Sequence, residues 1–380
     1  MKFMIKTKWS IFKYIPALLH SITLYFSFMI PLLLFPGCEK DFSFLSKKQK
    51  PAAPVYTSHK FTWRVDTLGD RGGASHLDDV FIIDENDAWA VGEIFLLDST
   101  GQYGDPFNAA HWNGEKWEFT RVPVRIFSTS NDTYPLPLTS VYAFGTNNVF
   151  VNSKRTLMEW DGNDWVEKAY FYTGNNDTTF GTIFKMWGRN SRDIYCVGAN
   201  GYIVHYDGAF FQRIESGVHT YINDIWGVVD ERTGKKKIYC TYGDRYHLDE
   251  YGILRIHNTY AVDTLRQTLP KQTSLYTVWF TNDSPLYIGG GKGVFYYQDS
   301  QWVEVPLPRY YPSRIRGNAP NDIFITGAFR YCAHYNGSTW HFYPELIENM
   351  GSFFGLDFKN DFLIAVGSVG QRALVLTGKR

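Results

Sequence analysis

The sequence predicts an all-β fold, a β-propeller of seven four-stranded blades, and three observations support it. A turn motif returns about every 38 to 48 residues: an aromatic strand, then Asn-Gly or Asp-Gly, then an aromatic residue three places after the Gly. Aromatic residues make up 18% of the chain and accompany 33 glycines, which suits half-buried strands and tight turns. After residue 37, no stretch has the period of an amphipathic helix. Strands and hairpins at a fixed period are typical of a propeller.

The turn motif is present in four clear copies and one altered copy. The clear copies centre on Asn113-Gly114, Asp161-Gly162, Asp207-Gly208 and Asn336-Gly337, and the altered copy on Asp299-Ser300. Type I′ hairpin turns, in which both central residues have positive φ, favour such pairs. Each turn is therefore expected to join the third and fourth strands of a blade.

The blade count comes from the two inner strands of each repeat. Seven apolar runs start at Asp79, Ser140, Lys185, Asp224, Thr277, Arg314 and Gly355, and a short polar loop and a second strand follow each of them. The last repeat has a third strand, Ala373 to Leu376, but no fourth, whereas a surplus strand, Phe61 to Val65, precedes the first repeat. We expect the surplus strand to pair with the last blade, which closes the ring and removes its open edge.

The N-terminus has the pattern of an export signal. Four lysines precede an apolar run from Tyr14 to Phe35, and a small residue, Gly37, stands directly before Cys38. Residues 1–37 resemble a bacterial lipoprotein signal peptide, which implies that Cys38 is acylated and holds the protein on a membrane of the bacterial cell envelope, as an outer membrane lipoprotein. An ordinary secretory signal and an uncleaved membrane anchor are the alternatives, since about 20 apolar residues can span a bilayer. Residues 38–60 are polar and Pro-rich and are expected to form a flexible tether to a propeller over 61–380.

From Phe61 onward, the repeats resemble exported propellers of the broad kind that includes photosystem II assembly-factor-like and Asp-box repeats. An Asp-box places Asp, Gly and Trp at the same hairpin, although here Asp or Asn directly precedes Gly. The resemblance implies the fold and leaves the activity open, because Asp-box propellers include both sialidase-like enzymes and non-enzymatic receptors.

Long loops are predicted on one face of the ring, and they carry the candidate ligand-binding aromatic residues. In a propeller, the loops after the second and fourth strands share a face, and here the loops Glu93 to Asn108, Pro123 to Pro137, Tyr170 to Thr179 and Asp244 to Tyr251 fall on it. Flat rings beside amides and carboxylates suit sugar or peptide recognition. The candidates are Tyr103, Phe107, Tyr134, Tyr170, Tyr172 and Tyr246. The alternative for each is that it packs its loop onto a blade.

Arginines near the inner strands form a second set of candidates. Arg71, Arg314 and Arg316, with Arg189, could bind a carboxylate over the channel. The alternative is that each pairs with a neighbouring acid such as Asp79 or Asp224. Three histidines, His111, His205 and His334, take equivalent third-strand positions, which is typical of a repeat framework.

The net charge argues against one class of function, and the positions of the cysteines favour free thiols over disulfides. After residue 37, the chain has 34 basic and 38 acidic residues, a net charge of −4, which argues against nucleic-acid binding. Cys196 and Cys240 take matching positions in adjacent blades, where a disulfide is conceivable, but equivalent points on neighbouring blades are usually too far apart. Free, buried thiols are the interpretation we prefer for these two residues and for Cys332.

The sequence therefore predicts a monomeric binding or scaffold module that recognises a glycan or a protein on its long-loop face. No metal spacing, cofactor motif or nucleophile motif is present, and no catalytic residue is assigned. The alternative is a glycoside hydrolase or lyase at the mouth of the channel, which would need paired carboxylates from among Asp79, Asp224 and Asp357.

Overall fold

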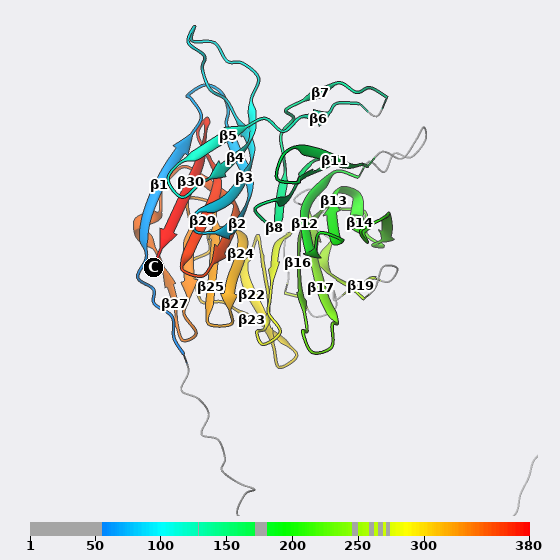
Figure 1. Cartoon of the computed structure of the whole chain (residues 1–380). Helices are drawn as coiled ribbons and strands as arrows, with labels where there is room; N and C mark the ends of the chain where they lie inside the picture. Colours follow the sequence, from blue (N-terminus) through cyan, green and yellow to red (C-terminus); the bar gives the residue numbers. More distant parts are fainter. Residues whose placement is uncertain are drawn as a thin grey trace, which may run out of the picture. The chain divides into compact units, whose positions relative to one another are not determined.

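The computed structural model describes residues 55–127, 129–171, 181–244, 250–257, 262–264, 269–270 and 274–380. Seven four-stranded antiparallel sheets form the blades of a ring, as Figure 1 shows from the side. The first strand of each blade contacts the first strands of its neighbours, which places these strands around the central channel. The prediction of a seven-bladed propeller is confirmed.

The strands of the first four blades follow the order of the sequence. Blade one is β2 (His76–Asp84), β3 (Asp87–Ile94), β4 (Phe107–Trp112) and β5 (Trp117–Thr120). Blade two is β8 (Ser140–Gly145), β9 (Asn148–Ser153), β10 (Thr156–Trp160) and β11 (Trp165–Tyr170). Blade three is β12 (Ile183–Asn190), β13 (Asp193–Gly198), β14 (Tyr202–Tyr206) and β15 (Phe211–Glu215). Blade four is β16 (Ile222–Val229), β17 (Lys236–Gly243), β18 (Tyr251–Ile256) and β19 (Val262–Thr264).

The remaining blades include the one that closes the ring. Blade five is β20 (Leu275–Trp279), β21 (Leu286–Gly290), β22 (Gly293–Gln298) and β23 (Gln301–Glu304). Blade six is β24 (Pro312–Ala319), β25 (Asp322–Gly327), β26 (Cys332–Tyr335) and β27 (Trp340–Phe342). Blade seven is β28 (Ser352–Lys359), β29 (Phe362–Val369), β30 (Arg372–Lys379) and, outermost, β1 (Thr62–Leu68). Outside the blades, the described residues also form a small hairpin, β6 (Val124–Arg125) with β7 (Thr133–Tyr134), and the 3₁₀ turns η1 (Ala199–Gly201) and η3 (Pro344–Leu346).

Ring closure occurs as the sequence predicts. Strand β1 pairs antiparallel with β30 along its whole length, from Thr62 opposite Lys379 to Leu68 opposite Ala373. The ordered contacts begin before Phe61, within the segment assigned to the tether. The backbone N–H of Thr57 donates to the carbonyl of Asn336 (3.0 Å), and the Tyr343 hydroxyl donates to the carbonyl of His59 (2.8 Å). Cys38 and the predicted signal peptide lie outside the described residues.

The apolar core is divided among the blade interfaces. Within the described part of the chain, seven clusters of buried side chains are present, and each lies between two neighbouring blades. Cys196, Cys240 and Cys332 are buried free thiols, as predicted. None of the helices described is long and apolar enough to span a membrane.

The repeated hairpin turns differ from the type I′ turns that we expected. Trp112 pairs directly with Trp117, so the loop between them has four residues, and of its Asn-Gly pair only Gly114 has a positive φ. The Asn113 side-chain oxygen instead accepts hydrogen bonds from the backbone N–H groups two and three residues ahead, those of Glu115 and Lys116 (3.0 Å each). Asp161, Asp207 and Asn336 do the same in their blades. Only the altered copy, Asp299-Ser300, has positive φ at both residues.

The three histidines belong to the repeat framework. The ring nitrogen Nε2 of His111, His205 and His334 lies 2.8–2.9 Å from an aspartate at the start of the second strand, Asp87, Asp193 and Asp322 respectively. Each imidazole also stacks on an aromatic ring of the second strand, with centroids 4.1–4.5 Å apart. These histidines therefore serve the packing of their own blades.

Candidate functional site

The mouth of the central channel is built from a backbone irregularity that recurs around the ring. In six of the seven inner strands, the pairing with the second strand shifts by one residue near the start of the strand, as in a β-bulge. The extra residues are Asp78, Phe184, Asn223, Tyr276, Ser313 and Phe354. A bulge redirects a side chain that regular pleating would keep between the sheets. Here it directs a set of side chains toward the channel.

Five of these six side chains, all but that of Ser313, line a hollow of about 340 Å³, and each blade or the segment that leads into it contributes to the wall. Its lining residues are Asp78, Thr139, Phe184, Tyr221, Asn223, Tyr276, Arg314 and Phe354. Four of them are aromatic, and the Phe184 and Tyr221 rings meet edge to face at 5.5 Å. The inner strands begin at this face of the ring, so the mouth lies on the long-loop face.

Arg314 supplies a positive charge to this mouth. Its Nη1 atom donates to the carbonyls of Ser313 (2.9 Å) and Tyr276 (3.1 Å), which orients the guanidinium. None of the described carboxylates forms an ion pair with it, and its buried Nε atom has no hydrogen-bond partner. An oriented guanidinium without a carboxylate partner is suited to binding an anionic group. The sequence prediction placed Arg314 at the channel, and the structure agrees.

Asp78 supplies a carboxyl group whose charge changes near neutral pH. Burial raises the pKa of Asp78 to about 6, and the neighbouring Asp79 adds to the rise, whereas His76 and Arg314 act against it. The His76 Nε2 atom is 3.6 Å from the Asp78 carboxylate. The net charge of the mouth therefore becomes more negative as the pH rises through about 6.

The acids proposed for an enzyme lie deeper, in a buried charged network below the mouth. Lys185 of blade three pairs with Asp79 of blade one, and Arg316 of blade six pairs with both oxygens of Asp224 in blade four (2.8 and 3.0 Å). Burial would raise the pKa of Asp224, but Arg316 and Arg314 outweigh it and lower this pKa to about 2. Asp357 is held by the N–H groups of Ile82 (2.7 Å) and Phe358 (2.9 Å). All three acids are used in joining blades.

This network corrects one of the predicted ligand-binding residues. The Arg316 side chain is only 4% exposed and satisfies Asp224 in a two-pronged ion pair. The alternative weighed for it, pairing with a neighbouring acid, is the one found. Arg316 is therefore part of the framework of the channel.

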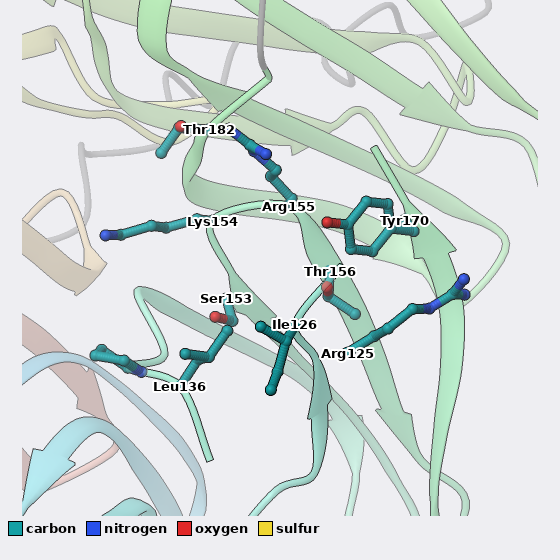
Figure 2. A pocket seen from close by; sticks show the side chains of 10 residues that line it. Arg125, Ile126, Leu136, Ser153, Lys154, Arg155, Thr156, Tyr170 and Thr182 are labelled. Atoms are coloured by element: carbon teal, nitrogen blue, oxygen red, sulfur yellow. The ribbon is translucent and has the colours of Figure 1, made fainter. Parts of the chain in front are cut away.

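A second hollow of about 390 Å³ lies on the same face, over blade two (Figure 2). It is lined by Arg125, Ile126, Leu136, Pro137, Ser153, Lys154, Arg155, Thr156, Tyr170 and Thr182. Figure 2 shows Tyr170, Thr156 and Ser153 around the space, with Lys154 and Arg125 extending toward opposite sides. Arg125 pairs with Glu167, and its guanidinium lies 5.1 Å from the centre of the Tyr170 ring. We name this hollow the outer groove.

The outer groove adjoins the mouth. Leu136 and Pro137 line the groove and Thr139 lines the mouth, while Thr182 lines the groove and Phe184 the mouth. The Thr139 hydroxyl donates to the Ile183 carbonyl (3.0 Å) and joins these two segments. Nearby residues of the same two segments therefore line both hollows.

The structure does not bring the other predicted rim residues together at one site. The Tyr103 hydroxyl donates to the Arg71 carbonyl, and its ring lies against Gly72 and Gly73. The Phe107 ring is covered by the guanidinium of Arg121, 3.9 Å from its centre. Phe107 thus packs within blade one, whereas Tyr103 joins its loop to the segment between β1 and β2 and stays 38% exposed.

The remaining predicted rim residues fall into three groups. Tyr134 stays 37% exposed on β7, Tyr170 lines the outer groove, and Arg71 lines another hollow at the seam between β1 and blade seven. Tyr172 and Tyr246 lie outside the described residues. The loop after β3 and the β6–β7 hairpin do project from the same side of the ring (Figure 1), as expected for long loops of one face.

Sequence reasoning missed the ring of mouth residues, although a signal for it was present. Asp78, Phe184, Asn223, Tyr276 and Phe354 each stand directly before one of the seven inner-strand runs. Aligning the repeats on those runs and reading one position upstream would have collected them. The bulge that turns them toward the channel, however, has no mark of its own in the sequence.

Comparison with known proteins identifies the fold alone. No protein-family model and no curated protein matches the chain. A structure of YCF48 bound to a D1 peptide has a TM-score of 0.59 at 14% identity, covering 86% of this chain and 99% of that one. A structure of a catalytically inactive virginiamycin B lyase from Staphylococcus aureus with quinupristin has a TM-score of 0.58 at 13% identity, covering 83% of this chain and 99% of that one. The WD40 propeller domain of Doa1 has a TM-score of 0.57 at 13% identity, covering 84% of this chain and 97% of that one.

Proposed function

We propose that the protein is a binding module that receives an extended protein segment at the mouth of its channel. The observation that carries the proposal is the ring of mouth side chains, five of them redirected by bulges, which places aromatic surface around the oriented guanidinium of Arg314. Aromatic rings give contact area at a small entropic cost, and the guanidinium gives orientation. The bound segment carries a carboxylate, from a side chain or from its C-terminus, that pairs with Arg314.

The shape of the face favours a chain over a compact ligand. The mouth is continued by the outer groove, whose Lys154 side chain is exposed and whose Tyr170 offers a flat ring. An extended segment with its carboxylate at Arg314 can continue over blade two, where basic side chains favour further acidic residues. The structure of YCF48 with a D1 peptide is a precedent for peptide binding by a propeller of this shape.

The state of the channel acids supports binding as the role over catalysis. The acids that hydrolysis would need are buried and are used in joining blades. The N-terminal pattern would place this module at the bacterial cell envelope, tethered through Cys38, which stays a prediction from the sequence. A segment of another envelope protein is the partner that fits these features.

The affinity of the mouth for peptides tests the proposal. The probe is a pool of eight-residue peptides with free C-termini, selected on the mature protein, followed by calorimetric titration of the best binder. Arg314→Gln should weaken binding by roughly ten- to hundredfold, because a hydrogen bond to a charged group contributes about 1.5 to 3 kcal/mol to the binding free energy. Wild-type affinity should fall by up to about tenfold from pH 5 to pH 7.5, because Asp78 becomes charged above about 6 and repels the carboxylate. Asp78→Asn should abolish this fall.

Two controls keep this experiment specific. Arg232→Gln removes an exposed arginine from the β16–β17 turn on the opposite face and should leave affinity unchanged. His76→Gln shows which group causes the pH dependence of the affinity. If Asp78 causes it, His76→Gln keeps the dependence and Asp78→Asn loses it; the reverse result would contradict the role given to Asp78. Equal affinity in wild type and Arg314→Gln would contradict the proposal, as would binders found only on a glycan array probed in parallel.

A further inference from the structure

A third hollow lies where the N-terminal strand closes the ring, apart from the mouth. It measures about 390 Å³, and three arginines from separate segments line it. Arg71 follows β1, Arg330 lies in the turn between β25 and β26, and Arg372 opens β30. The exposed side chain of Met350 adds an apolar wall. We name this hollow the seam pocket.

The positive charge of the seam pocket is largely uncompensated. Among the described residues, no carboxylate forms an ion pair with Arg71 or Arg372, and Arg330 has only the exposed Glu348 at 3.9 Å. The Arg330 side chain is 19% exposed, and its buried Nε atom has no hydrogen-bond partner. Three arginines that line one hollow, with one exposed acid beside Arg330, give it a positive potential. A ligand that supplies negative charge is attracted to such a hollow.

The backbone that carries Arg330 provides an independent observation. Phe329 and Arg330 are the central residues of the turn from Ala328 to Tyr331, and both have a φ of 59°. Such turns favour Asn and Gly, because bulky side chains are disfavoured at positive φ. Strain of this kind tends to be retained at functional sites. Here it holds the arginine toward the seam pocket.

We propose that the seam pocket binds a phosphate or sulfate group. Guanidinium forks match tetrahedral oxyanions, and three forks from three directions can surround one such group. The volume leaves room for an attached group of sugar or glycerol size against Met350. The bound anion would join the segment after β1 to blades six and seven, and so stabilise ring closure. This inference does not depend on peptide binding at the mouth.

Thermal unfolding of the full mature chain tests the proposal. With inorganic phosphate or pyrophosphate in place of chloride at equal ionic strength and pH, the midpoint of unfolding should rise by about 2 °C or more. Phosphate also stabilises proteins by exclusion from their surface, so the comparison between variants decides the result. Arg330→Gln with Arg372→Gln should lose most of the rise, and Arg71→Gln, in an exposed loop, part of it. Arg232→Gln is the matched control and should keep it.

Phosphorus NMR supplies a measurement that does not depend on stability. Pyrophosphate resonances should broaden on addition of wild type and of Arg232→Gln, and not on addition of the double variant. Glycerol phosphate in solution and vesicles containing phosphatidylglycerol then distinguish a free ligand from a lipid headgroup. An equal rise in the unfolding midpoint for wild type and the double variant, or broadening that survives both substitutions, would overturn the proposal.

Discussion

A chain that lacks Phe61 to Leu68 is expected to lose the cooperative fold of the whole ring. Removing this segment exposes the edge of β30 along its full length and takes away Phe61 and Trp63, which pack against the core between blades six and seven. The Trp63 ring meets Tyr343 at 4.8 Å, and the Phe61 ring stacks on Trp63 at 5.4 Å. Two partly buried aromatic residues and a ladder of hydrogen bonds amount to roughly 5 kcal/mol, comparable to the whole stability of a domain.

Calorimetry and circular dichroism measure this loss against two shorter changes. A chain that begins at Val55 keeps all described contacts of β1 and should melt at the parent temperature. Trp63→Ala, which leaves the strand in place, should lower the free energy of unfolding by about 3 to 5 kcal/mol. A chain that begins at Gly69 and melts cooperatively at the parent temperature would show that ring closure does not stabilise the propeller.

Replacing Asp224 by Ala is expected to be the most damaging single substitution in the channel. It leaves the Arg316 guanidinium buried without its partner and removes the acceptor used by the Thr277 hydroxyl and the Val278 N–H. Breaking one side of a buried ion pair typically lowers the free energy of unfolding by about 3 to 5 kcal/mol. Denaturant titration measures the change.

The matched control is an ion pair of the same chemistry at the surface. Glu304→Gln breaks the exposed pair with Arg309 and should lower the free energy of unfolding by less than about 1 kcal/mol. The Asp224 pKa of about 2 lies below its value in the unfolded chain, so its contribution is present above about pH 4 and is lost as the pH falls through 2. Equal losses for the two variants would contradict a structural role for the buried network.

The repeat period and the surplus N-terminal strand were sufficient to predict the architecture. Seven inner runs gave the blade count, and the predicted strand Phe61 to Val65 overlaps the strand that closes blade seven, Thr62–Leu68. These features can be predicted from the sequence because strand alternation and turn residues depend on residues that are close together in the chain. The prediction of type I′ hairpin turns was wrong, and the reason is also local. Asn113 and its equivalents form side-chain hydrogen bonds to the loop backbone and do not adopt positive φ.

The candidate site was predicted only in part, because it depends on contacts between distant segments. Arg314 and Arg316 are two positions apart on one strand, yet one faces the mouth and the other is buried against Asp224 of a blade two places away. No sequence pattern distinguishes them. Tyr103 and Phe107 have the composition of a binding loop, but Gly72, Gly73 and Arg121 provide packing partners that the sequence does not reveal as neighbours.

Site-specific photo-crosslinking tests the central proposal most directly. A photoreactive phenylalanine analogue at Phe354 lines the mouth, and the same analogue at Phe210, 74% exposed in a hairpin of the opposite face, is the control. After irradiation of cells that make the full chain, adducts are digested and identified by mass spectrometry. The proposal predicts a protein adduct at Phe354 that maps to one segment of one partner, and none at Phe210. Adducts of equal abundance at both positions would contradict it. So would adducts at Phe354 that contain no protein, recognised because protease does not digest the attached group.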